Sequence, residues 1–229
     1  MENRKFLTGN QLKIIALIAM TFDHLGVQIF TDNIIFRVIG RIAMPIFAYM
    51  ISEGCRYTKN RLKYFCTVAL VALVCQLVYF FAMGSLYQCI FVTFLFSIAI
   101  IYAFDGLKKR KDLFSGIFFC ILLVFAFFMT EVLPSFIPET DYRIDYGFFG
   151  VILPVLIFIF NKREQKLLMT FIGLCLLSSY YGGIQWVSLL SVVLLALYNG
   201  KRGEANLKYL FYIYYPLHLL VIYFLSFVL

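Results

Sequence analysis

Charged side chains are scarce in this chain. Only 14% of its 229 residues are Asp, Glu, Lys or Arg, whereas 63% are hydrophobic and 19% are aromatic. Such a composition leaves too little polar surface to cover a water-soluble domain. It therefore excludes an ordinary soluble enzyme and predicts an integral membrane protein.

The chain also lacks the period-two alternation of polar and apolar residues that outer-membrane barrels show. Its apolar residues instead form nine long runs of about the length that a membrane-spanning helix needs. These predicted spans are 12–30, 35–52, 62–83, 87–104, 113–133, 146–160, 166–181, 184–198 and 208–228. The sixth to eighth are short, so we expect them to be tilted, broken or partly re-entrant. The predicted fold class is all-α, a polytopic bundle that forms one domain over residues 1–229.

Most basic residues fall in or beside alternate breaks between these runs. If the N-terminus is cytoplasmic, all of the 20 Lys and Arg residues except Arg37, Arg41 and Arg143 fall on the cytoplasmic side. The positive-inside rule then places the N-terminus inside and the C-terminus outside, after nine crossings of the inner (plasma) membrane. The net charge of +8 is explained by this topology, so no nucleic-acid partner is expected.

Two further features lack any sign of a special role. The six cysteines show no C-x-x-C spacing, so we expect apolar packing and neither disulfides nor a metal site. The longest polar break, Glu131 to Asp145, is predicted to lie outside, and Pro134 and Pro138 argue against a continuous helix there. It is either a lid that faces the substrate or an ordinary solvated connector.

Histidine is rare too, and both copies lie inside apolar runs. His24 follows Asp23 in the first run, and His218 follows Pro216 in the last. Arg41 lies about one and a half turns inside the second run, where an arginine needs a carboxylate, backbone carbonyls or an anionic ligand. Asp23 is the nearest carboxylate in depth, and the two side chains are expected either to serve a site or to fix helix register as a buried pair. Adjacent helical residues point about 100° apart, so a direct relay from Asp23 to His24 is not expected.

Several segments together resemble the TraX family of bacterial membrane proteins. The resemblance extends over essentially the whole chain and rests on Leu7–Ala16, Phe22–His24, Gly40–Ala48, Glu53–Asn60, Asp145–Gly147, Lys208–Tyr212 and Tyr215–His218. The positions that match the family's motifs are Asp23, His24, Arg41, Glu53, Tyr57, Asn60, Pro216 and His218.

This resemblance implies a membrane acyltransferase that takes an acetyl group from cytoplasmic acetyl-CoA. The family's named member is associated with N-terminal acetylation of pilin, and here the acceptor is expected to be a peptide amine, a sugar or a lipid. His24 or His218 would act as the base, and Arg41, held by Asp23, would stabilise negative charge. The cationic loop from Arg56 to Lys63 is expected to hold the phosphates of acetyl-CoA, through Arg56, Tyr57, Lys59, Asn60 and Lys63.

Two other functions use the same buried polar residues. A transporter or flippase would use them to bind substrate or protons, although the nine runs show no inverted repeat of the kind many transporters carry. A non-catalytic assembly factor would tolerate apolar replacements of His24 and His218. A metal site built from two histidines and a few carboxylates is not expected.

Overall fold

The computed structural model describes residues 6–205 and 207–228, and within them it is helical, with no strand longer than an isolated bridge. Arg4 and Lys5, which were predicted to be cytoplasmic, lie outside the described residues. The helices are α1 (Gly9–Gln28), α2 (Ile34–Gly40), α3 (Ala43–Tyr57), α4 (Arg61–Met83), α5 (Ile90–Arg110), α6 (Leu113–Phe127), the π-helix η1 (Phe128–Val132), α7 (Leu133–Phe136), α8 (Gly147–Ile159), α9 (Arg163–Tyr181), the 3₁₀-helix η2 (Gly183–Leu189), α10 (Leu190–Ala196) and α11 (Lys208–Val228).

Every predicted apolar run is helical in the structure. Five helical stretches of the described chain are long and apolar enough to cross a membrane: Ile34–Tyr57, Arg61–Met83, Ile90–Arg110, Leu113–Phe136 and Tyr209–Val228. Helix α8 and the pair η2–α10 are apolar but shorter, as expected for the sixth and eighth runs. A helical membrane protein is therefore confirmed.

Polar residues at the breaks start the helices. Thr8 and Gln11 form a capping box at α1, in which each side chain accepts a backbone N–H of the other residue. Asn33, Asn60 and Asp112 cap α2, α4 and α6 with their side-chain oxygens. These short polar residues fix where each apolar run begins to be helical.

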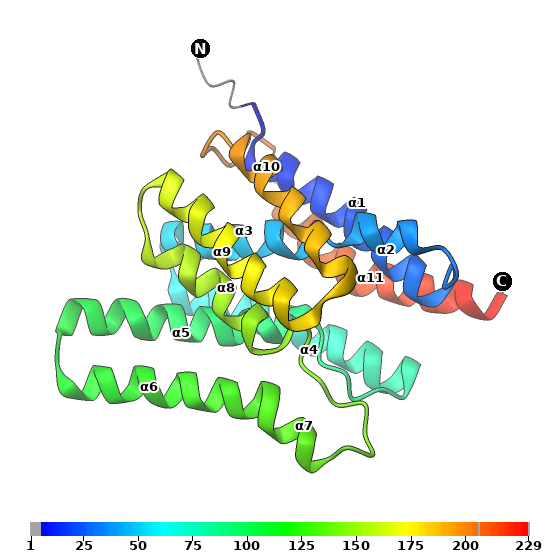
Figure 1. Ribbon diagram of the computed structural model, residues 1–229, viewed down its shortest axis with the longest axis horizontal. Coiled ribbons are helices and arrows are strands. Elements are labelled where there is room, and N and C mark those ends of the chain that lie inside the picture. The colour runs from blue at the N-terminus through cyan, green and yellow to red at the C-terminus, as the bar shows by residue number, and fades with distance from the viewer. Residues whose placement is uncertain (1–5, 206, 229) are drawn as a thin grey trace. The chain divides into compact units, whose positions relative to one another are not determined.

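The chain divides into two compact units. The first contains the described residues up to Met50 and those from Lys162 onward, and the second is Ile51–Asn161. In the first unit α1 packs against both α2 and α11, so that the first and last helices of the chain lie side by side (Figure 1).

The second unit is built around α5, which packs against α4, α6 and α8. Helices α5 and α6 form a hairpin joined by Lys111 and Asp112 (Figure 1). Its core brings together apolar side chains of several helices, among them Val68, Ile98, Ile101, Ala126 and Val155. These residues are almost fully buried.

The second predicted span is not one helix, because the backbone turns at Arg41 and Ile42 between α2 and α3. Pro45 follows four residues after Arg41 and cannot donate the N–H that a continuous helix would send back to it. Helix α3 then continues to Tyr57, beyond the predicted end at residue 52. The predicted phosphate-binding loop is consequently only Thr58–Asn60, with Arg56 and Tyr57 on α3 and Lys63 on α4.

No continuous helix crosses the break from Glu131 to Asp145, as its two prolines predicted, but helical structure reaches further into the break than the fifth predicted span, which ended at residue 133. Helix α6 continues through η1 into α7 and ends at Phe136. Pro134 lies just after the π-helix, across which the Leu133 N–H donates to the carbonyl of Phe128. The π-helix directs Glu131 toward α8, where its Oε1 accepts the backbone N–H of Phe148 at 2.8 Å.

The rest of that polar break is tied to the segment before α5. Asp141 accepts hydrogen bonds from Ser85 Oγ (2.5 Å) and from the backbone N–H of Leu86 (2.8 Å). Gln88 exchanges backbone hydrogen bonds with Arg143 and Asp145. This anchoring fits an ordinary connector better than it fits a mobile lid.

Candidate functional site

The two histidines meet, although 194 residues separate them in sequence. His24 on α1 and His218 on α11 approach each other with 3.0 Å between His24 Nδ1 and His218 Nε2. Each ring also bonds its own helix: His24 Nδ1 lies 3.0 Å from the carbonyl oxygen of Met20, and His218 Nδ1 lies 3.1 Å from that of Tyr214. The site is therefore a pair of imidazoles between the first and last helices.

These contacts assign the ring protons. A carbonyl oxygen only accepts, so both Nδ1 atoms carry the hydrogen in neutral rings. His218 Nε2 is then a lone pair, and it accepts from His24 Nδ1–H, which is shared with Met20. Among the described residues no partner for His24 Nε2 is found. This nitrogen is the one ring atom of the pair that is left to accept a proton from another molecule.

Aromatic side chains of α11 hold the pair in place. The Tyr214 ring stacks on His218 at 5.4 Å between centroids with an interplanar angle of 10°, and Tyr215 meets both imidazoles edge-on. The Tyr214 hydroxyl is 2.6 Å from Thr21 Oγ1 on α1. Both helices thus contribute to orienting the imidazole pair.

An ion pair lies beside the histidines in sequence. Arg41 Nη2 donates to Asp23 Oδ1, as depth in the membrane predicted, and Arg41 Nε donates to the carbonyl of Arg37 at 3.3 Å. Arg37 Nε is 3.6 Å from the same carboxylate oxygen. Asp23 is therefore held between two arginines, and no described hydrogen bond joins it to His24.

Glycine allows α1 and α2 to approach closely enough for this pair. A Cβ at Gly40 would overlap the Asp23 side chain, and a Cβ at Gly26 would overlap the Cβ of Phe36. The turn at Arg41 then directs the guanidinium back toward α1. The ion pair depends on these two glycines as well as on its charged groups.

Gln185 is a member of the site that sequence reasoning missed. Arg41 Nη1 donates to Gln185 Oε1 at 3.3 Å. Because a guanidinium only donates, the amide must present its oxygen to Arg41, and its Nε2 faces the other way. Within the described part of the chain, that buried Nε2 has no acceptor, and the buried Ser188 Oγ also lacks a partner.

Gln185 and Ser188 share one face of η2, because residues three apart eclipse in a 3₁₀-helix. The sequence signal for them is the polar residue between Gly182-Gly183 and Trp186, with serines at three-residue spacing after it. That signal is weak without the fold. Gln185 and Ser188 eclipse each other only in a helix with three residues per turn. The sequence predicted an α-helix there, which has a longer period.

The residues predicted to bind acetyl-CoA lie in the second unit, and Arg56 there is already engaged. Its guanidinium donates to Asn161 Oδ1 and to the carbonyls of Phe158 and Phe160, and it lies over the Phe158 ring at 4.8 Å. Arg56 therefore ties the end of α3 to the end of α8. Glu53, one turn earlier on α3, is buried.

The other members of the predicted phosphate site are exposed. Asn60 caps α4 by accepting the backbone N–H of Lys63 at 2.8 Å. Lys59 and Lys63 flank that cap with exposed side chains, and 69% of the Tyr57 surface is exposed. Two lysines beside the N-terminus of α4 can hold an anion. Among the described residues no group of three or more His, Cys, Asp or Glu side chains could hold a metal ion.

Comparison with known proteins gives a family for this architecture. The model of the family described as TraX protein matches residues 8–226. A protein of Dichelobacter nodosus named "Probable fimbrial assembly protein FimC, serogroup H1" is 26% identical over 91% of each chain. An uncharacterized protein of Rickettsia prowazekii (strain Madrid E) is 53% identical over 38 residues, which are 17% of this chain and 15% of that protein. No solved structure matches. The family match reaches from the cap of α1 to the end of α11 and includes both histidines and the Asp23–Arg41 pair, so the chain belongs to the TraX family.

Proposed function

We propose that this chain is an integral membrane acyltransferase that moves an acetyl group from acetyl-CoA to an amine or hydroxyl acceptor. The observation that supports it best is the His24–His218 pair, with its hydrogen-bonded orientation and its one uncommitted ring nitrogen. Polar groups at such depth are costly, so a membrane protein that keeps them usually uses them. In the proposed mechanism the two histidines move the proton, and Arg41, held by Asp23, stabilises negative charge.

His24 Nε2 would accept the proton as the acceptor nucleophile attacks the acyl carbon. The thioester C–S bond would then break, and the CoA sulfur would leave as a thiol with the proton that His24 returns. His218 receives the His24 Nδ1–H bond and stabilises the charge that His24 gains. Arg41, fixed by Asp23 and Gln185, provides positive charge near the developing oxyanion. Acetyl-CoA, when bound, supplies the activated acyl group, and Lys59 and Lys63 are the exposed cations suited to its phosphates. Arg56, Tyr57 and Asn60 complete the proposed binding region.

The proposal includes a topology of nine crossings with a cytoplasmic N-terminus, in the inner (plasma) membrane. In this orientation Lys59, Lys63 and the 108–111 basic cluster face the cytoplasm, where acetyl-CoA is found. His24 and Arg41 then lie toward the outer half of the bundle. The acceptor would accordingly enter from the outer side.

The acceptor is proposed to be a peptide N-terminus, a sugar or a lipid. The Dichelobacter nodosus relative is named as a probable fimbrial assembly protein, which favours a protein subunit of a surface fibre as the first acceptor to test. The chemistry is the same for each acceptor, because each presents an amine or a hydroxyl that must lose a proton during transfer.

The test is acetyl-CoA binding and slow thioester hydrolysis by the purified protein in detergent, measured as free-thiol release. Wild type should bind and turn over, and His24→Ala should abolish thiol release while leaving binding intact. His218→Ala and Arg41→Ala should reduce turnover. Asp32→Asn, an exposed substitution between α1 and α2, is the matched control and should behave as wild type.

Absence of binding by well-folded protein at millimolar acetyl-CoA would overturn the proposal. Accumulation of a solute in sealed vesicles that depends on Asp23 and Arg41 would instead favour a transporter.

A further inference from the structure

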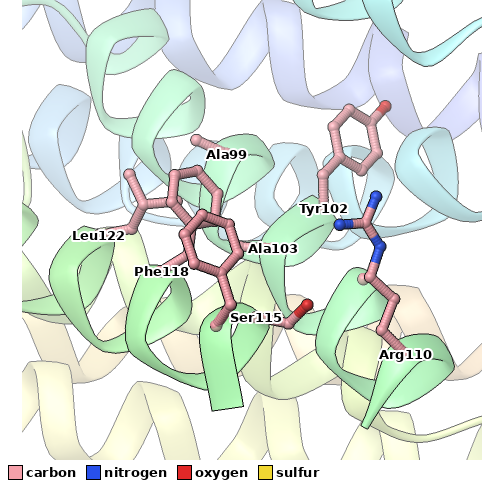
Figure 2. A pocket seen from close by; sticks show the side chains of 9 residues that line it. Ala99, Tyr102, Ala103, Arg110, Ser115, Phe118 and Leu122 are labelled. Carbon is pink, nitrogen blue, oxygen red and sulfur yellow. The ribbon is translucent and has the colours of Figure 1, made fainter. Parts of the chain in front are cut away.

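A cavity of about 380 Å³ lies in the α5–α6 hairpin of the second unit, and none of its lining residues belongs to the proposed acyl-transfer site. Its α5 wall consists of Ala99, Tyr102, Ala103, Gly106 and Arg110, and its α6 wall consists of Phe114, Ser115, Phe118 and Leu122. In Figure 2 the Arg110 side chain stands beside Tyr102, while Phe118 and Leu122 lie on the other side. The walls are apolar apart from the Arg110 end.

Small residues of α5 create this space. Ala99, Ala103 and Gly106 share one face of the helix because they are four and three residues apart. A Cβ built on Gly106 meets no atom of the described chain within 4 Å. The opposing Phe114 and Phe118 are 74% and 49% exposed, so their rings do not close the gap.

The length of the cavity matches one lipid tail. Ala99 and Arg110 are separated by about 16 Å along the helix at 1.5 Å per residue. Half of a hydrocarbon core is about 15 Å thick. A groove that begins at the charged end of a membrane-spanning helix and ends near the middle of the membrane therefore fits the acyl chain of a lipid in one leaflet.

The charge at the mouth of the groove indicates the headgroup. Lys108, Lys109, Arg110 and Lys111 are consecutive, and such clusters at the end of a span attract anionic lipids. The neighbouring carboxylates are already engaged: Asp105 pairs with Arg61 at 2.5 Å and Lys109 at 2.9 Å, and Asp112 caps α6 through Ser115. Arg110 makes no salt bridge within the described chain and points its charge at the groove.

We propose that the α5–α6 groove binds an anionic phospholipid, with one acyl chain between Ala103, Gly106 and Phe118 and its phosphate at Arg110. The arginine fork suits a phosphate because it offers paired donors. This site is independent of the proposed acyl transfer. It would hold whether the chain is an enzyme or a transporter, because it depends only on the hairpin and its position in the membrane.

Native mass spectrometry of the full chain tests the proposal, with phosphatidylglycerol and phosphatidylcholine of identical acyl chains as probes. Wild type should retain phosphatidylglycerol preferentially, and Arg110→Ala should weaken its retention roughly fivefold without affecting phosphatidylcholine. Gly106→Leu should exclude both lipids, because its side chain fills the groove. Equal retention of the two lipids by wild type would overturn the proposal.

Two matched controls separate this site from general charge and helix effects. Lys108→Ala removes the same charge from the same helix end but about 200° around the helix from Arg110, and it should weaken retention of phosphatidylglycerol clearly less than Arg110→Ala does. Gly116→Leu adds the same side chain to α6 outside the groove, where the one atom within 4 Å of a new Cβ is Leu107 Cδ1 at 3.8 Å. A loss in Lys108→Ala equal to that in Arg110→Ala would show a diffuse charge effect and refute the site.

A photoactivatable group on the acyl chain of phosphatidylglycerol adds a direct readout. Crosslinks should map to the Phe114–Leu122 segment in wild type and disappear from it in Gly106→Leu. Crosslinks confined to other helices would contradict the proposed site. So would displacement of the lipid by palmitoyl-CoA with higher affinity, which would assign the groove to a long-chain acyl donor.

Discussion

At the residue scale, the imidazole pair is defined by which ring nitrogens carry hydrogen. Two nitrogens 3.0 Å apart cannot both be donors, and the carbonyls of Met20 and Tyr214 require an Nδ1–H on each ring. The proton arrangement follows from backbone geometry alone. In the proposed mechanism it favours His24 as the base, a choice that sequence reasoning left open.

We therefore predict that both histidines are Nδ1–H tautomers at neutral pH. Nitrogen-15 NMR of histidine-labelled protein measures this directly, and with only two histidines the signals can be assigned by a single His218→Phe substitution. Observation of an Nε2–H tautomer at His218 would contradict the assignment. The Phe variant should also release His24 Nδ1–H from its partner and shift its resonance.

The Asp23–Arg41 pair gives the second prediction at this scale. Asp23→Asn leaves a buried guanidinium without its carboxylate and should destabilise the protein by about 3–5 kcal/mol. The measurement is the thermal midpoint in detergent, followed by fluorescence-detected size exclusion. Asp32→Asn, which removes an exposed carboxylate between the same helices, should leave the midpoint unchanged. Equal midpoints for the two variants would show that the pair adds nothing to stability.

Some of these residues could be predicted from sequence and others could not. Asp23 and Arg41 were matched because each charge lies within an apolar run at similar depth, and an unpaired charge there is costly. His24 and His218 were placed at comparable depth for the same reason. Gln185 was missed because an uncharged amide in a short run carries no comparable cost, and because its orientation depends on a 3₁₀ geometry.

At the element scale, close packing of α1 on α2 depends on Gly40. Gly40→Ala places a methyl group where the Asp23 side chain lies, so it should destabilise the protein by about 1–3 kcal/mol and lower any activity that needs Arg41. Gly116→Ala is the control, because its added methyl group would make an ordinary van der Waals contact of 3.8 Å with Leu107 Cδ1 and no overlap. The thermal midpoint should fall for the first variant and stay level or rise for the second.

The connector between α7 and α8 provides a prediction about pH. Hydrogen bonds from Ser85 Oγ and the Leu86 backbone N–H lower the pKa of Asp141 below its ordinary value. The stability that these bonds add is therefore present above the unfolded-state pKa of about 3.9, and is lost as pH falls through the folded-state pKa. Because Asp141 is exposed, the effect should be under about 1 kcal/mol.

Hydrogen exchange of the Leu86 amide measures this loss of protection. Exchange corrected for its intrinsic pH dependence should accelerate below about pH 4 in wild type. Asp141→Asn should show the faster exchange already at neutral pH. An exchange rate in wild type that does not change across this range would contradict the role of Asp141.

The positions of the helices were predicted well, because the thickness of the membrane sets the length of each apolar run in the sequence. Two irregular pieces were not, namely the π-helix at Phe128–Val132 and the continuation through Pro134. Each depends on which backbone groups find partners, such as Glu131 with the Phe148 N–H. An apolar run has the same composition whether its helix is straight or broken.

At the scale of the whole molecule, the proposed topology places the turn between α5 and α6 on the cytoplasmic side of the membrane. It places the segment after α7 on the outer side. In a variant with all six cysteines replaced, a new cysteine at Lys111 should react with a membrane-impermeant maleimide only after the cells are opened. A cysteine at Asp141 should react from outside. Labelling of Lys111→Cys in intact cells would reverse or abolish the proposed orientation.

The start of α1 is hydrogen-bonded to the segment between α10 and α11. Backbone bonds join Leu7, Gly9 and Asn10 to residues 197–202, and the Asn10 amide reaches the carbonyl of Ala205 at 2.6 Å. During synthesis the Asp23–Arg41 pair can therefore assemble as soon as the second helix has been inserted. His24, by contrast, cannot form its pair until residue 218 has been synthesised. At about 5–20 residues per second, this takes roughly 10–40 s. A nascent chain is thus expected to be inserted and oriented before the histidine pair can form, and a chain that stops before residue 218 would lack this pair.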